Sequence, residues 1–239
     1  MNKYEDIAID LKIRIEKGEF KKKNKLPTGN QLMQQYHVSK NTINNAINLL
    51  ISEGLIFAIH GSGFHIRYPN KGTIRLNNTI GFSNEHPGEK LDRKILDFQL
   101  MECDENLAKN LECEIGTYVY YIKRLMYIDN HPFAVEYTYY NKDYIPYLNE
   151  DIARASIFKY IINDLKISIG FSEKYISAYP LSNIDRDLLL LEPGAFGLII
   201  EDNTFTSTGH KFNYSKIWYN YKYANFFNND KATRKKTKS

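Results

Sequence analysis

The chain has 239 residues, of which 43% are hydrophobic, and a net charge of +4, which suits two modest domains or one large one. No apolar run approaches the roughly 18 residues of a membrane span, and the polar start at residues 1–6 is unlike a signal peptide. Cys103 and Cys113 are the only cysteines, and no Cys/His cluster has metal-ligand spacing. We therefore expect a cytoplasmic protein with free thiols rather than a disulfide, no metal, no cofactor and no membrane partner.

The charge is unevenly distributed along the chain. Residues 1–70 contain 10 basic and 6 acidic side chains, whereas residues 71–230 contain 17 and 22. Residues 231–239 add five basic side chains, and we expect residues 229–239 to form a basic, disordered tail. A basic front end beside an acidic body predicts an anionic partner such as nucleic acid, although ordinary surface scatter would give the same pattern.

Three short helices are predicted in the first 54 residues. Residues 4–17 form the first, because apolar side chains recur at helical spacing until Gly18, a typical C-terminal cap. Thr28 and Gln31 have the spacing of a capping box and begin the second helix. Ser39 caps the third helix, which Gly54 ends. Two short helices joined by a tight turn are typical of a helix-turn-helix.

A hairpin is predicted directly after the third helix. Residues 55–59 are an apolar strand, residues 60–63 contain two glycines and form the turn, and residues 64–66 return. A hairpin in this position is the wing of a winged helix-turn-helix, which we assign to residues 1–68.

The outward face of the third helix carries Lys40 and four amide side chains, namely Asn41, Asn44, Asn45 and Asn48. Asparagine is a mediocre helix former, whereas an ordinary solvated face uses Glu, Lys and Gln. An asparagine amide donates to and accepts from adenine in the major groove, and Ser39 and Lys40 are placed to meet phosphates. The alternative is a compositional bias toward Lys and Asn without special use.

The motifs of this region resemble those of GntR-family repressors. The matching segments are Leu26-Pro27-Thr28, residues 38–43, Glu53-Gly54-Leu55-Ile56 and Gly61-Ser62-Gly63. The resemblance implies DNA contacts at Thr28, Asn30, Ser39, Lys40, Asn41, Thr42 and Asn44, and at the wing tip His60, Gly61, Ser62 and Gly63. Two family arginines are replaced by Asn30 and Asn44, and the family Glu by Gly29, so we expect an operator richer in A·T pairs than is usual.

The remaining chain predicts a linker at residues 69–78 and an α+β domain with an antiparallel sheet at residues 79–228. The predicted strands are residues 96–103, 117–128, 132–140, 167–178, 196–206 and 211–223, and the predicted helices are residues 104–111, 156–165 and 184–191. The domain contains the short motifs Ala108-x-x-Leu111, Lys123-Arg124, Pro132 to Glu136, Ser156-Ile157-Phe158 and Tyr219 to Tyr223. Through these motifs it resembles the UTRA effector-binding domain of the HutC subfamily, whose fold is similar to that of chorismate lyase. The resemblance implies a homodimer that responds to a small molecule, often a sugar phosphate, and residues 156–191 are most similar to trehalose-operon repressors.

Six residues are candidates for binding the effector: Ser83, Arg124, Glu136, Ser156, Asn213 and Tyr219. An inward arginine on a sheet needs an anionic partner, which is either the effector or an internal carboxylate such as Glu136. Ser83 and Ser156 match family ligand positions but equally suit plain capping. Met126 replaces a second family arginine, and Asn213 stands where a carboxylate is common, which departs from a conventional amino-sugar-phosphate site.

These observations predict a DNA-binding transcription regulator, and more specifically a repressor of a carbohydrate operon that a sugar phosphate such as trehalose 6-phosphate releases. In this mechanism the linker at residues 68–73 transmits an effector-driven change in the spacing of two winged helices. The alternatives are a small carboxylate effector, a chorismate-lyase-like enzyme, and a winged helix that binds protein. No acid/base constellation supports an enzyme, and sheet packing explains the period-two tyrosines better than a base-stacking platform does.

Overall fold

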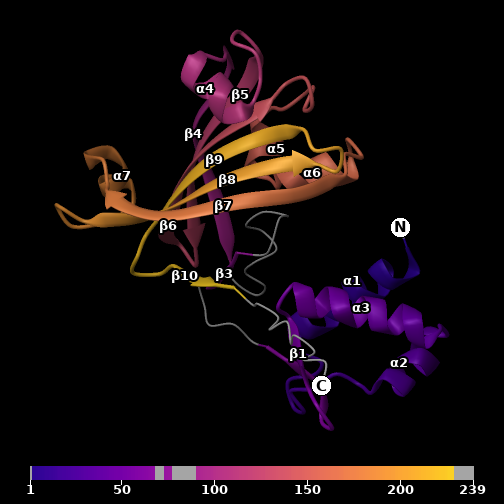
Figure 1. Cartoon of the computed structure of the whole chain (residues 1–239). Helices are drawn as coiled ribbons and strands as arrows, with labels where there is room; N and C mark the ends of the chain where they lie inside the picture. Colours follow the sequence, from indigo (N-terminus) through magenta and orange to yellow (C-terminus); the bar gives the residue numbers. More distant parts are fainter. Residues whose placement is uncertain (1, 68–72, 77–89, 229–239) are drawn as a thin grey trace, which may run out of the picture. The chain divides into compact units, whose positions relative to one another are not determined.

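The computed structural model describes residues 2–67, 73–76 and 90–228. The chain divides into two compact units, which are treated separately below (Figure 1). The winged-helix unit comprises Met1–Asn78 and Phe226–Ser239, and the sheet unit comprises Thr79–Asn225. The chain therefore leaves the winged-helix unit once and returns to it near its C-terminal end.

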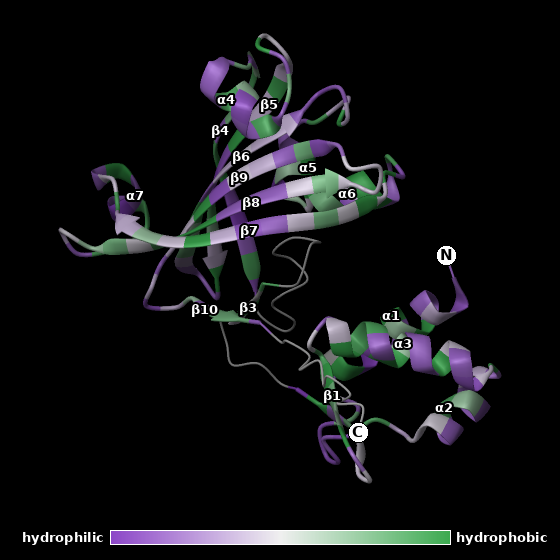
Figure 2. Ribbon diagram, in the orientation of Figure 1, coloured by the Kyte–Doolittle hydropathy of each residue, from purple (hydrophilic) through white to green (hydrophobic). Residues whose placement is uncertain are grey.

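The winged-helix unit contains three helices and a hairpin, as the sequence predicts. Its elements are α1 (Lys3–Glu16), α2 (Gly29–Tyr36), α3 (Lys40–Ser52), β1 (Ile56–Ile59) and β2 (Gly63–Ile66). The core beneath them is entirely apolar, and Leu11, Leu32 and Leu50 are fully buried in it. Figure 2 shows hydrophobic residues along α1, α3 and β1, where these elements meet.

Local capping chemistry fixes where the helices begin and end. Thr28 accepts a hydrogen bond from the Gln31 backbone N–H, and the Gln31 side chain accepts one from the Thr28 N–H, which completes the predicted capping box. Ser39 caps α3 by accepting from the Thr42 N–H. His37 and Gly54 adopt positive φ values of 53° and 70°, and each ends its helix in a left-handed conformation.

A short two-stranded ribbon pairs a segment predicted as linker with a segment that follows the last predicted strand. β3 (Thr73–Arg75) pairs with β10 (Asn225–Phe227), and the Leu76 N–H donates to the Phe227 carbonyl at 2.9 Å. The prediction that the last strand runs over residues 211–223 is wrong. That strand stops at Tyr219, because Asn220 begins a turn in which its carbonyl accepts from the Tyr223 and Ala224 N–H groups.

The sheet unit is built on one antiparallel six-stranded sheet with the order β4-β5-β6-β9-β8-β7. The strands are β4 (Leu91–Glu102), β5 (Tyr118–Ile128), β6 (His131–Asn141), β7 (Ile169–Pro180), β8 (Phe196–Thr206) and β9 (Lys211–Tyr219). β4 begins five residues earlier than predicted. As an edge strand it places Asp92 and Lys94 in solvent, so these charges do not interrupt it.

Four helices pack against the sheet. They are α4 (Glu105–Leu111), α5 (Glu150–Arg154), α6 (Ile157–Asn163) and α7 (Asn183–Leu188). Side chains of α5 and α6 pack on the face that carries Ile122 and Tyr140, whereas α4 packs near Val119 and α7 near Val135 on the other face. The sequence did not predict α5, since five residues are too few for helical periodicity, and α7 is shorter than the predicted 184–191.

Candidate DNA-binding surface and effector site

The DNA-binding candidates of α2 and α3 lie on the surface of the winged-helix unit. Asn30, Lys40, Asn41 and Asn44 are exposed, and Ile43, Ala46 and Ile47 on the opposite side of α3 are buried. The core therefore holds α3 by one side and leaves its amide side chains free for another molecule. Thr42 is half-buried, and its hydroxyl is 3.0 Å from that of Ser39.

The wing hairpin presents the remaining candidates. Gly61 and Gly63 at its tip have φ values of 75° and 98°, which only glycine adopts without strain. The hydroxyl of Ser62 lies 2.9 Å from Nε2 of His65 on β2. His60 is exposed at the end of β1, so the four candidate tip residues form one connected turn.

Lysines that sequence reasoning left out of the site line a cleft beside the start of α2. The cleft encloses about 660 Å³ and is lined by Lys22, Lys23 and Lys25 together with Thr28 and Gln31. Lys25 forms a β-bridge with His65, which brings the lysine loop next to the wing. None of the three lysines forms an ion pair within the described part of the chain. Their clustering in sequence was visible, but their position beside the wing depends on strand pairing.

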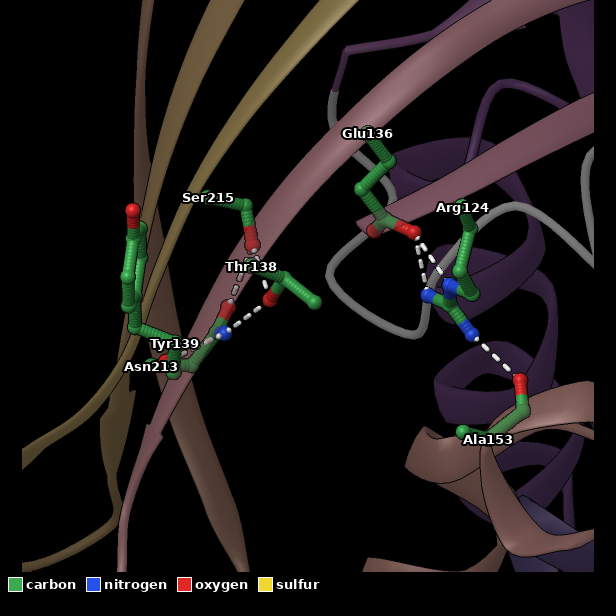
Figure 3. A network of polar contacts seen from close by, with 7 residues as sticks. All are labelled: Arg124, Glu136, Thr138, Tyr139, Ala153, Asn213 and Ser215. Carbon is green, nitrogen blue, oxygen red and sulfur yellow. Dashed lines mark hydrogen bonds and ion pairs between the residues drawn. The ribbon is translucent and has the colours of Figure 1, made fainter. Parts of the chain in front are cut away.

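The effector candidates converge on one face of the sheet. Arg124 pairs with Glu136 across β5 and β6, and Asn213 and Tyr219 on β9 point to the same side because side chains alternate along a strand. Arg124 Nε donates to Glu136 Oε2 at 2.6 Å, and Arg124 Nη1 donates to the Ala153 carbonyl of α5 at 2.8 Å (Figure 3). Both charged side chains are buried. The internal ion pair, one of the two alternatives for Arg124, is therefore formed in this structure.

Asn213 belongs to a second buried cluster on the same face. Its amide Nδ2 donates to the Thr138 hydroxyl at 2.8 Å and to the Tyr139 carbonyl at 3.0 Å (Figure 3). Its Oδ1 accepts from the Ser215 hydroxyl at 3.1 Å. Tyr219 is buried against Phe133 with the two rings nearly perpendicular.

Of the two serine candidates, the structure describes only Ser156. Ser156 caps α6 by accepting from the Lys159 N–H at 3.4 Å, which is the structural role that the sequence left open. Ser156 lies three residues after Ala153, whose carbonyl accepts from Arg124, so α5 and the start of α6 both border the region around Arg124. Ser83 lies outside the described residues, as do residues 68–72 of the predicted linker and the tail at residues 229–239.

Sequence reasoning missed two further charged side chains, which lie near the ion pair of Arg124 and Glu136. Arg93 on β4 is half-buried, and burial first and the charge of Arg124 second lower the pKa of its guanidinium group. Asp202 on β8 is paired with Lys174 at 3.2 Å, and burial raises the pKa of its carboxyl group. Arg93 and Asp202 lie on different strands from Arg124 and Asn213, and the strand order that brings the four residues to one face is non-local.

On the opposite face of the sheet, α4 borders a cleft of about 340 Å³ lined by Tyr137, Tyr139 and Trp218. Among the described residues, no group of three His, Cys, Asp or Glu side chains has the geometry of a metal site, and no helix is long and apolar enough to cross a membrane.

Comparison with known proteins defines the class of this chain. Residues 3–66 match the bacterial regulatory proteins of the gntR family, and residues 86–224 match the UTRA domain. The chain belongs to the GntR family and is a ligand-responsive, DNA-binding transcription regulator with a UTRA effector domain, and its relatives are regulators, not enzymes.

Individual relatives align along nearly the whole chain. It is 35% identical to the uncharacterized HTH-type transcriptional regulator YydK of Bacillus subtilis over 95% of this chain and 96% of YydK. The crystal structure of YydK superposes with a TM-score of 0.78 over 97% of this chain and 100% of that chain. The HTH-type regulators GmuR and TreR of Bacillus subtilis are 29% and 26% identical, each over 90% of this chain and 92% of the relative.

Proposed function

We propose that this protein is a homodimeric repressor that binds double-stranded operator DNA and is released by an anionic small molecule, most specifically a sugar phosphate. The observation that carries the proposal is the exposed row of Lys40, Asn41 and Asn44 on α3, a helix held by an apolar core. Asparagine amides that can both donate and accept hydrogen bonds suit the base edges in the major groove.

The lysine cleft supports binding to the DNA backbone on the same unit. Lys22, Lys23 and Lys25 line the cleft next to the wing and have no carboxylate partner among the described residues. Lysines in such a position neutralise phosphates and release counterions, which makes affinity depend on salt. Base contacts from α3 and phosphate contacts from this cleft then act together.

The charges around Arg124 support an anionic effector. The guanidinium groups of Arg124 and Arg93 lie near Glu136 on a buried face of the sheet, and burial first and the charge of Arg124 second lower the pKa of Arg93. The fork geometry of an arginine side chain suits a phosphate or a carboxylate. Glu136 would exchange part of its bonding to Arg124 for sugar hydroxyl groups.

Trehalose 6-phosphate is the most specific effector that we propose. The likeness of residues 156–191 to trehalose-operon repressors favours it, and the regulator TreR is among the relatives. Met126 and Asn213 replace residues that would suit an amino-sugar phosphate, which leaves a small carboxylate as the second candidate. With trehalose 6-phosphate as the effector, the regulated operon would serve carbohydrate uptake or catabolism.

Fluorescence anisotropy on labelled DNA from upstream of its own gene tests the proposal. We expect tight binding that weakens strongly between about 50 mM and about 200 mM salt and that one member of a sugar-phosphate panel reverses. Binding untouched by the panel but reversed by small carboxylates would favour the second candidate. Absence of sequence-preferring binding at both salt concentrations would overturn the repressor proposal.

Base preference provides a sharper test of the α3 surface. We expect the native operator to be rich in A·T pairs, because asparagines stand where the family uses arginines. The Asn44→Arg variant should shift preference toward G·C at the contacted position, since a bidentate arginine reads guanine. An unchanged preference in this variant would contradict the predicted contact.

A further inference from the structure

The winged-helix unit and the sheet unit are joined by two segments of chain, not one. The sheet unit ends at Asn225, and the following residues belong to the winged-helix unit. There β10 pairs with β3, and the Leu76 N–H donates to the Phe227 carbonyl at 2.9 Å. A change in the sheet unit therefore reaches the winged-helix unit both through the chain that follows β3 and through β10.

Phe227 of β10 contacts the wing through Arg67. The guanidinium carbon of Arg67 lies 5.0 Å from the ring centroid of Phe227 and 5.2 Å from that of Phe57 on β1. The Arg67 backbone N–H donates to the Leu55 carbonyl at 2.8 Å, which fixes the start of this side chain at the base of the wing. Arg67 Nε is buried without a hydrogen-bond partner among the described residues, so ring contacts hold this group.

The contacts continue from Phe57 to the tip of the wing. Phe57 and His65 are partners across the β1–β2 hairpin, and their rings stack at a centroid distance of 5.6 Å. His65 Nε2 is 2.9 Å from the hydroxyl of Ser62, a tip residue. Phe227, Arg67, Phe57, His65 and Ser62 thus form one continuous series of contacts.

We propose that Phe227 and Arg67 are positioning residues for DNA binding: β10 holds the wing in the orientation that reaches DNA. Because β10 directly follows the sheet unit, the same contact gives that unit a second means of control over the wing, besides the chain that joins it to β3. The proposal rests on the proposed function, in which the wing tip meets DNA. Beyond the proposed function, it assigns a role to Phe227 and Arg67 and a route of control through β10.

Hydrogen exchange of the full-length, DNA-free protein tests the positioning role directly. Phe227→Leu keeps apolar volume but removes the ring face, and we expect backbone amides of residues 57–66 to exchange about fivefold to tenfold faster. Amides of α2 and α3 should exchange at the wild-type rate. Phe227→Tyr should behave as wild type, and Tyr221→Leu, an exposed position before β10, is the matched control.

DNA binding provides the second readout. In hydroxyl-radical footprints on the upstream DNA, Phe227→Leu should lose protection at the outer minor-groove positions and keep the central major-groove positions. Unchanged wing exchange in Phe227→Leu, or equal acceleration in α2 and α3, would overturn the positioning role. If the wild-type protein protects no DNA, the proposed function fails, while the exchange measurement still decides whether β10 holds the wing.

Discussion

The two units of this protein place their candidate binding side chains in opposite environments. In the winged-helix unit, Lys40 and Asn44 are exposed above an apolar core and have no structural duty. In the sheet unit, Arg124, Glu136 and Asn213 are buried and bonded to one another or to nearby backbone. This difference fits the two proposed partners: DNA is too large to enclose, so its candidate ligands lie outside, whereas candidate ligands of a small molecule can lie inside if they satisfy each other.

This contrast has a consequence for tolerance to mutation. Removing an exposed α3 side chain such as that of Lys40 or Asn44 leaves nothing unsatisfied in the described part of the fold, so we expect binding and stability to separate. Removing a buried effector candidate leaves its partner without a bond, so we expect the two properties to change together. The variants below test that difference, beginning with the largest expected effect.

Arg124→Ala should destabilise the protein most, by about 3–5 kcal/mol, because it leaves Glu136 buried and unpaired. Urea denaturation of the purified variant measures the loss. The matched control is Arg154→Ala, whose exposed ion pairs with Glu150 and Asp151 contribute only about 0–1 kcal/mol. Similar losses in the two variants would remove the distinction between buried and exposed charges.

Asn44→Ala should weaken operator binding by about 1–3 kcal/mol, roughly tenfold to hundredfold, and leave the free energy of unfolding unchanged. Anisotropy titration and urea denaturation of the same preparation measure both quantities. Asn106→Ala, an exposed amide on α4 of the sheet unit, is the control and should change neither. A stability loss in Asn44→Ala as large as its binding loss would show that this amide supports the fold.

Thr28→Ala should lower the free energy of unfolding by about 1 kcal/mol, because the N-terminal cap of α2 loses its side-chain acceptor. Thr28→Ser keeps the hydroxyl and should retain most of the stability. Thermal unfolding followed by circular dichroism compares the three proteins. If Ala and Ser variants unfold together, the hydroxyl is not what holds the start of α2.

Asp202→Asn should change the pH dependence of stability. Burial raises the pKa of this carboxyl in the folded state, nearby Glu136 raises it further, and Lys174 opposes both. The folded state therefore binds more protons, and wild-type stability falls as pH rises from about 4, where an unfolded Asp titrates, through the raised value. The variant should lose this fall, and parallel stability curves for the two proteins would contradict the prediction.

The same contrast decides what could be predicted from sequence. The helices, caps and wing of the first unit depend on residues three or four apart, as in the capping box of Thr28 and Gln31, so the sequence alone predicted them correctly. The sheet unit was predicted as an antiparallel α+β domain, and five of its six strands were placed to within about two residues at their starts, a usual error for boundaries.

What remained hidden in the sheet unit depends on pairing between distant strands. Asp202 and Ser215 lie opposite each other on β8 and β9, and Ser215 bonds Thr138 on β6 at 2.7 Å. No local pattern marks such a cluster, since each strand alone shows only a polar residue at every second position. The short elements α5 and β10 were missed for the same reason, because long-range contacts stabilise them.

The ribbon of β3 and β10 also bears on how such regulators exchange their parts during evolution. A single crossover between two genes, made just after β3, would replace the sheet unit together with β10 and leave β3 facing a foreign strand. Retaining the native ribbon requires two crossovers, one near residue 77 and one near residue 224. The sheet unit is thus an insertion into the other unit rather than an appendage, and chimeric regulators should be assembled with both junctions in mind.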